Sequence, residues 1–416
     1  MSFNKRFVMK KTQRIHSTSS PESFSIRLPS YVYLYFFCQS INLMTAVISV
    51  AVAAVVGNKI SSNPLYATVP YGVQFLFIFL GTYPASLLMK KYGRKVGFTT
   101  GAVFLLFAGL TGYFSIVESS FSLLVISHGF IGLFTACANF YRYAVTDGLP
   151  ESLQPKALSL VVAGGIIAGI LGPTMSSQLQ DISGFPQFSL CYASLMVLAF
   201  INLAIIYFLP DANVTSFETE EGHKNNILKN RDIVFASICI AACGYGLMNL
   251  LMIQSSLKMD HMHIKFEDVA FAIQWHVVAM FFPSFFTGIL ISRLGHIAVI
   301  VSGFVLFIIS FSINIYDISY NNIALSLILL GVGWNFTYVG GSSMLTSSLV
   351  NSSEKQRWQG VGDTAIAIFA TIGAMSPSFL LNDIGWKGSN IISIVMCIVS
   401  LFGIMLLKIK HGHELK

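Results

Sequence analysis

Charged residues are scarce in this chain, and their scarcity excludes most classes of soluble protein. Asp, Glu, Lys and Arg make up only 10% of its 416 residues, whereas a soluble domain carries roughly 25%. Hydrophobic residues make up 54%, and the mean hydropathy is +0.70. This composition is typical of a chain surrounded by lipid, so we interpret the protein as an integral membrane protein.

Cysteine is also sparse, and its placement excludes a disulfide-stapled fold. All six cysteines fall within apolar stretches, and none has a spacing that indicates a disulfide framework. The nearest approach to a metal site is His261 and His263 beside Asp260, on a short polar loop. No paired nucleophile and base accompanies them. We therefore predict that the chain is not an enzyme and that it needs no cofactor and no metal.

Long apolar runs dominate the sequence. About a dozen of them reach roughly 20 residues, the length that crosses a bilayer as a helix. The predicted spans are 29–56, 66–89, 96–116, 120–146, 157–180, 187–209, 232–256, 268–291, 297–315, 322–349, 360–381 and 388–408. An even number of spans puts both ends of the chain on one side of the membrane.

The basic residues indicate which side that is. Lysine and arginine gather in the two ends of the chain and in the loops on the same side, whereas the opposite loops hold only Lys59, Lys258, Lys265 and Lys387. By the positive-inside rule, both termini are predicted to be cytoplasmic in the inner (plasma) membrane. The net charge of +7 therefore reports orientation, and no nucleic acid partner is expected.

The second half of the sequence repeats the first at a nearly constant offset. Gly169, Gly172 and Pro173 belong to a segment that recurs 204 residues later with Gly373 and Pro377. Three further pairs share this offset to within two residues, which indicates two copies of one helix bundle. The predicted domains are a basic cytoplasmic tail 1–28, an N-terminal six-helix bundle 29–209, a cytoplasmic linker 210–231, a C-terminal six-helix bundle 232–408 and a cytoplasmic tail 409–416.

A basic turn follows the second span and recurs after the eighth. The residues of the two turns are Gly93, Arg94 and Lys95, and then Arg293 and Gly295. With Gly172-Pro173 in the fifth span, they make the chain resemble the major facilitator superfamily of secondary transporters over essentially its full length. Lys90 and Ser292 stand where the family's signature has an aspartate.

The resemblance implies an all-α membrane protein with 12 transmembrane helices in two pseudo-symmetric six-helix bundles. It also implies alternating access, in which the two bundles rock about a site between them. The basic turns would then act at the cytoplasmic gate, and the glycine-proline segments would pack helices together.

Polar residues on one face of the fourth span are the most costly in the membrane. His128, Gly132, Thr135, Asn139 and Arg142 are spaced four, three, four and three residues apart, which aligns them along a helix. An ionisable residue at membrane depth indicates function by default. We predict that this stripe lines the substrate pathway. The alternative is that the histidine or arginine bonds a neighbouring carbonyl or reaches an interface.

Other spans add polar and aromatic residues to the predicted pathway. They are Asn42, Asn249, Gln274, His276, Trp334, Asn335 and Tyr338. Polar groups in lipid must face protein or a water-filled cavity, so these stripes should converge on one space. The set suits a solute with hydrogen-bonding groups and a ring, and an amino acid, a small peptide-like siderophore or an amphipathic drug all remain open. The amides could instead join helices.

Proton carriers are few, because the acidic residues lie near the ends of the spans. Asp363 lies furthest inside its span, and a histidine titrates in the physiological range. We predict a secondary active transporter that moves a small organic solute through the lipid bilayer as a monomer, coupled to protons by His128, His276 or Asp363. A proton-independent uniporter and a non-transporting receptor or partner protein with the same fold are the alternatives.

Overall fold

The computed structural model describes residues 28–147, 149–150, 153–210, 231–349 and 352–411. Of the predicted linker and the two predicted tails, only residues 28, 210, 231 and 409–411 lie within these ranges. The described residues form fourteen α-helices and one short 3-10 helix. The α-helices are α1 (Ser30–Ile60), α2 (Val69–Tyr92), α3 (Arg94–Val117), α4 (Phe121–Ala138), α5 (Tyr141–Ala144), α6 (Gln154–Leu179), α7 (Ser189–Tyr207), α8 (Arg231–His261), α9 (Phe266–Phe281), α10 (Ser284–Leu294), α11 (His296–Tyr316), α12 (Tyr320–Ser347), α13 (Ser352–Asp383) and α14 (Gly385–His411). The 3-10 helix η1 covers Pro64–Tyr66.

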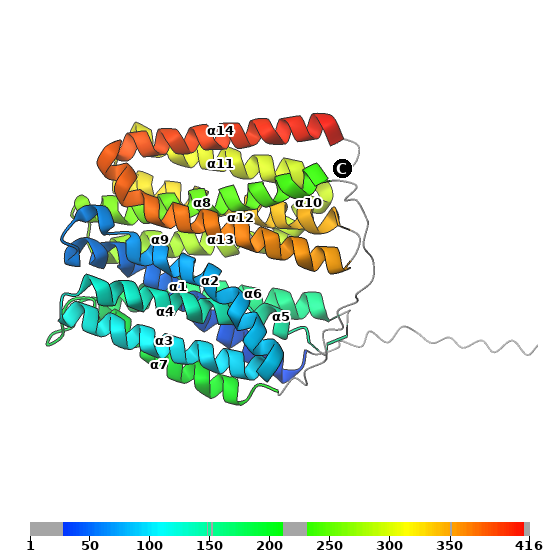
Figure 1. Cartoon of the computed structure of the whole chain (residues 1–416). Coiled ribbons are helices and arrows are strands. Elements are labelled where there is room, and N and C mark those ends of the chain that lie inside the picture. Colours follow the sequence, from blue (N-terminus) through cyan, green and yellow to red (C-terminus); the bar gives the residue numbers. More distant parts are fainter. Residues whose placement is uncertain (1–27, 148, 151–152, 211–230, 350–351, 412–416) are drawn as a thin grey trace, which may run out of the picture.

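The helices form two bundles that lie side by side (Figure 1). Helices α1 to α7 pack among themselves, and helices α8 to α14 do the same. Within the described ranges, 11 helical segments are long and apolar enough to cross a membrane, or up to 12 if the bent pair α9 and α10 is one span. The predicted all-α fold with two six-helix bundles is confirmed.

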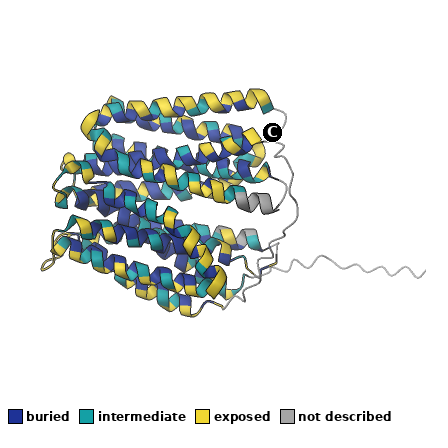
Figure 2. Ribbon diagram, in the orientation of Figure 1, coloured by how far each residue is buried: buried dark blue, intermediate teal, exposed yellow. Residues whose placement is uncertain are grey.

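Burial in the molecule is greatest in the helices that open the two halves. Helices α1 and α8, which open the two halves, have the most buried apolar windows among the spans, whereas α13 and α14 have the least. Figure 2 shows buried residues along the centre and exposed residues along the outermost helices. The exposed positions of α7 and α14 carry apolar side chains such as Phe200 and Val399, because this surface faces lipid rather than water.

Each membrane-length helix, and the bent pair α9 and α10 taken together, crosses the molecule from end to end, so alternate helix ends lie together. We call the end where α1 begins and α14 ends the terminal end (right in Figure 1), and the other the distal end. Between α9 and α10 the chain bends by 43°. Pro283 lies at this break and has no N–H for the helix ladder, which accounts for the bend.

The two basic turns have the same backbone geometry. Gly93 joins α2 to α3 with φ +91°, and Gly295 joins α10 to α11 with φ +83°. Positive φ is strained for residues that carry a Cβ atom. The glycines that mark the sequence repeat are therefore required by equivalent tight turns at the terminal end of each bundle.

Candidate solute pathway

The two bundles are in contact at the distal end. Thr68 Oγ1 donates to the carbonyl oxygen of Met375 at 3.0 Å and accepts from Ser378 Oγ at 3.1 Å. The rings of Phe188 and Phe266 meet edge to face with centroids 4.9 Å apart. These contacts join α2 and the start of α7 to the C-terminal bundle, so uncharged groups close this end of the interface.

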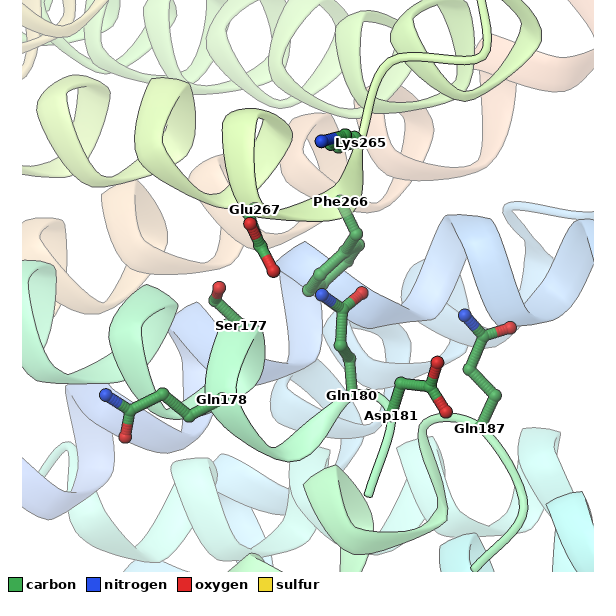
Figure 3. Close-up of a pocket in the computed structure, with 8 residues that line it drawn as sticks. All are labelled: Ser177, Gln178, Gln180, Asp181, Gln187, Lys265, Phe266 and Glu267. Carbon is green, nitrogen blue, oxygen red and sulfur yellow. The ribbon is translucent and has the colours of Figure 1, made fainter. Parts of the chain in front are cut away.

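A polar hollow of about 490 Å³ lies between α6 and α9 at the distal mouth (Figure 3). Its lining residues are Ser177, Gln178, Gln180, Asp181, Gln187, Lys265, Phe266 and Glu267. In Figure 3, Phe266 and Glu267 point toward the segment that carries Ser177 and Gln180. The hollow contains none of the predicted pathway residues, so it is a surface feature of the mouth rather than the predicted site.

Aromatic side chains gather where the bundles meet between the two ends. Trp334 and Tyr338 on α12 stack with centroids 4.9 Å apart and an interplanar angle of 7°. Tyr245 on α8 lies edge-on to both, at 5.6 and 6.0 Å. Phe281 on α9 meets Trp334 at 6.1 Å, and Phe75 on α2 meets Tyr245 at 6.2 Å. We call these five residues the ring cluster. It draws on both bundles.

Buried polar atoms without a partner lie on helices α1 and α4 and in the ring cluster itself. In the described part of the chain they include Gln39 Oε1, Asn42 Oδ1 and Thr45 Oγ1 on α1, Thr135 Oγ1 on α4 and Trp334 Nε1 in the cluster itself. Helix α1 contacts α8 across the interface. A buried polar atom left unpaired costs about 1–3 kcal/mol, so a bound water or ligand that reached these atoms would be stabilised there. Asn42 and Thr135 were predicted to line the pathway.

His128 lies in a closed network inside the N-terminal bundle. Its Nδ1 is 3.2 Å from Gln74 Oε1 and 3.3 Å from Ser49 Oγ, and its Nε2 is 3.1 Å from the Tyr192 hydroxyl. Ser49 donates to the same Gln74 oxygen at 2.6 Å. A neutral histidine that donates from Nδ1 and accepts at Nε2 satisfies this network. His128 thus joins α1, α2, α4 and α7 with its side chain fully buried.

His276 occupies a similar position in the C-terminal bundle. Its Nδ1 donates to the carbonyl oxygen of Leu327 at 2.7 Å, whereas its Nε2 is buried without a partner. The contact links α9 to α12 within one bundle. Like His128, it is fully buried, so neither histidine lies on an exposed face of the interface.

The predicted amides divide between helix joining and more open positions. Asn335 donates to the carbonyl oxygen of Met280 at 2.7 Å and accepts from Thr287 at 2.6 Å, so it braces the bend between α9 and α10. Asn249 donates to the Ala370 carbonyl oxygen at 3.2 Å and links α8 to α13. The remaining amides, Asn139 and Gln274, are half-buried.

The predicted stripe on the fourth span is interrupted. Helix α4 ends at Ala138, and Asn139 begins a turn that leads into the short helix α5. Arg142 lies on α5, beyond this turn. Its Nη2 lies 3.5 Å from Asp363 Oδ2 on α13, and its guanidinium lies over the Tyr143 ring at 4.8 Å. The structure thus pairs two of the predicted residues across the bundle interface.

Comparison with known proteins identifies the fold. Residues 34–273 and 234–415 match the family model described as Major Facilitator Superfamily. The chain belongs to this superfamily. Among solved structures, the chain is similar to a mutant of the nucleoside transporter NupG, with a TM-score of 0.65 and 14% identity over 90% of this chain and 99% of that one.

Curated relatives of this superfamily member are transporters by name. The riboflavin transporter RfnT of Brucella anthropi is 29% identical over 86% of this chain and 91% of its own. An uncharacterised MFS-type transporter of Bacillus subtilis, YdeG, is 24% identical over 81% of this chain and 83% of its own.

The basic turn of this superfamily member contacts its own bundle. Arg94 forms an ion pair with Asp147, through Nε to Oδ2 at 2.5 Å, and Lys95 Nζ donates to the carbonyl oxygen of Leu209 at 3.2 Å. Asp147 follows α5, and Leu209 follows α7. In this conformation the turn therefore braces the N-terminal bundle at the terminal end.

The glycine-proline segments bring helix backbones close together. A Cβ atom at Gly172 would lie 2.9 Å from Val47 Cγ1 on α1. One at Gly373 would overlap the Gly246 carbonyl oxygen on α8, and Pro173 and Pro377 lie inside their helices. At both positions a missing side chain lets α6 and α13 pack on the central helix of their own bundle.

Three members of the ring cluster were not predicted from the sequence. Tyr245 could have been found, because it precedes Asn249 by four residues and so shares the helical face of a predicted pathway residue. Phe75 and Phe281 sit among many similar aromatic residues, and no spacing distinguishes them. Only the packing of α2, α8 and α9 shows which of these rings meet.

Proposed function

We propose that the chain is a secondary active transporter that carries a small, uncharged organic solute with a planar ring, by alternating access between its two bundles. The observation that carries this proposal is the ring cluster at the bundle interface, in which Trp334 Nε1 is buried without a partner. Stacked aromatic rings provide flat apolar contact for a planar ring. Oxygen and indole N–H groups would bond the polar part of the solute.

The charged side chains near the ring cluster favour an uncharged solute. Among the described residues, the charged groups close to the ring cluster are Arg142 and Asp363, and they pair with each other. A solute with a net charge would have to break this pair or remain without a counter-charge beside it. Riboflavin, the solute named for the relative RfnT, has a planar ring and a hydroxylated chain, so it is the first solute to test.

The transporter is further proposed to be driven by protons, with His128, His276 and Asp363 as the candidate groups. It is proposed to work as a monomer, with the terminal end in the cytoplasm. The basic loops support this orientation. Single cysteines at Lys91 on the terminal end and Asn321 on the distal end, both exposed, should label from the inside and the outside of intact cells. The opposite pattern would reverse the orientation.

Counterflow in proteoliposomes tests the proposed transport. Vesicles that contain the purified protein and unlabelled riboflavin should accumulate labelled riboflavin from outside, whereas an amino acid or a dipeptide in its place should give no exchange. Binding of riboflavin without any exchange would favour the non-transporting receptor. Absence of both would exclude riboflavin, and the same assay would then be run with other planar solutes.

A matched pair of tryptophan variants tests the role of the ring cluster. Trp334 lies in the cluster and is buried, whereas Trp275 on α9 is exposed on the outer surface. Trp334→Leu should lower counterflow about tenfold, since it removes a ring contact and an N–H that the solute uses. Trp275→Leu should leave counterflow unchanged. Equal effects of the two substitutions would remove the ring cluster from the pathway.

A further inference from the structure

Arg142 and Asp363 join the two bundles by opposite charges. They lie 221 positions apart in the chain, on α5 and α13, with 3.5 Å between Nη2 and Oδ2. Their side chains are 31% and 49% exposed, so water reaches both. Both residues lie in the half of the molecule next to the terminal end, near the starts or ends of the helices that meet there.

The two histidines differ from this pair in their burial and in the bundle to which their partners belong. His128 and His276 are fully buried, and their hydrogen-bond partners belong to their own bundles. A ligand shifts an equilibrium between two conformations only if it interacts differently with them. A proton on either histidine would not change an attraction between the bundles, whereas a proton on Asp363 would.

We propose that Asp363 is the site that binds the coupling proton and that Arg142 is its counter-charge across the interface. This assignment rests on the proposed transport function and selects one of its three candidates. In the step itself, a proton from water forms an O–H bond with one carboxylate oxygen. The charge of Asp363 changes from −1 to zero, its attraction to Arg142 is lost, and no other bond is made or broken.

The groups around Asp363 are few. On α5 they are Arg142 and Tyr143, and on α12 the Tyr338 side chain lies within reach of Arg142. Within the described residues, no ion pair or hydrogen bond reaches Asp363 from α2, α8 or α14. Among the described residues, Arg142 is therefore the cation that interacts with the Asp363 carboxylate.

Tyr338 connects the proton site to the ring cluster. It stacks on Trp334 on one side and approaches Arg142 on the other. Only Tyr338 would then separate a solute on the ring cluster from the Arg142 guanidinium, which balances the charge of Asp363. Solute and proton therefore act on the same cation, which is what coupling between their binding requires.

The direction of the effect follows from the geometry. In this structure the distal end is closed and the ion pair is long, at 3.5 Å. A rocking motion that closes the terminal end would bring α5 and α13 together and shorten the pair. Ionised Asp363 therefore favours the terminal-closed conformation, and protonated Asp363 favours the terminal-open one.

Distances between spin labels test the site without any solute. Labels are placed at Lys91 on α2 and Ser347 on α12, both exposed at the terminal end of different bundles, in a background with the native cysteines replaced by alanine. Pulsed electron resonance at about pH 8 should give mainly short distances, and at about pH 4.5 mainly long ones. Asp363→Asn should give the long distances at both pH values.

Matched variants separate the proton site from a general effect. Asp383→Asn removes a carboxylate at the other end of the same helix, and His128→Gln and His276→Gln remove the competing candidates, so all three should keep the pH response. Asp363→Glu should also keep it. Arg142→Gln should abolish it, since the protonated and ionised forms of Asp363 would then have no cation to distinguish them.

Each outcome decides between the proposals. A wild-type distance distribution that does not change with pH, or a full response in Asp363→Asn, would overturn the proton site even if counterflow of solute is intact. A pH response that disappears in Asp363→Asn would support the proton site even if riboflavin is not moved, in which case only the proposed solute fails. If Asp363→Asn does not fold, Arg142→Gln gives the same decision.

Discussion

The distal end of the bundle interface is closed by uncharged contacts, whereas at the terminal end the described residues place an ion pair between the bundles. Each distal hydrogen bond contributes about 0.5–1.5 kcal/mol, and the Phe188–Phe266 ring pair contributes about as much. A solvent-exposed ion pair such as Arg142–Asp363 contributes about 0.2–1 kcal/mol.

In the conformation described, the contacts between the bundles are therefore stronger at the distal end than at the terminal end. The difference also makes the two ends respond to different variables. Uncharged contacts are insensitive to pH and salt, whereas an exposed ion pair weakens with salt and with protonation. The proposed alternating access needs one end that yields to the solute and the proton, and the terminal end has a contact that would do so.

The largest expected effect comes from the basic turn at the terminal end. Gly93→Leu places a bulky side chain at φ +91°, which costs roughly 1–2 kcal/mol or more in backbone strain. The space around Gly93 is open, so the effect would act through the turn and not through a clash. Counterflow should fall about tenfold or more, with normal membrane insertion.

Gly288 provides the control for that experiment. It is a helical glycine of α10 that also faces open space, but its φ is not positive. Gly288→Leu should leave counterflow close to the wild-type rate. If Gly93→Leu transports as well as Gly288→Leu, the turn has no part in the motion of the terminal end.

A smaller effect is expected at His128. It concerns the stability of the fold rather than the opening of either end of the bundle interface. His128→Ala leaves the Tyr192 hydroxyl without its partner and removes a group that joins four helices. The loss should be about 1–3 kcal/mol, seen as a lower thermal unfolding midpoint in detergent. The pH dependence of transport should stay as in the wild type. A flat profile between about pH 5.5 and 7.5, where histidine titrates, would instead make His128 the coupling group.

The smallest effect is expected from weakening the distal end at one ring pair. Phe188→Ala removes the contact with Phe266 and should shift the equilibrium toward the distal-open form by about 0.5–1.5 kcal/mol. A cysteine placed near the ring cluster should then label several-fold faster from the distal side. Phe200→Ala on the lipid-facing side of α7 serves as the control, and an equal increase there would attribute the effect to lost packing in general.

Much of this fold was predictable from the sequence, because bilayer thickness fixes the length of each apolar span. The repeat was equally visible, since Gly93 and Gly295 are required by turns that no other residue adopts without strain. The break after Ala138 was not predicted. Residues 128 to 142 have helical spacing throughout, and nothing in that spacing shows where the helix ends.

The candidate site was predictable only in part. Trp334 and Tyr338 were each predicted to line the pathway, and in the structure they stack on α12. Spacing does not show which residues of different helices meet, so Arg142 and Asp363 were each predicted but not their pairing. The neighbours of His128 were missed for the same reason, because Gln74 and Tyr192 come from distant parts of the chain.

The most direct test measures both ends of the interface in the same protein. One pair of spin labels spans the terminal end at Lys91 and Ser347, and a second spans the distal end at Glu118 and Asn321, all four exposed. As the pH falls from about 8 to about 4.5, the terminal distances should lengthen while the distal distances shorten, because in the proposed mechanism the bundles rock about the ring cluster. Two distances that stay fixed, or that lengthen together, would contradict alternating access in this protein.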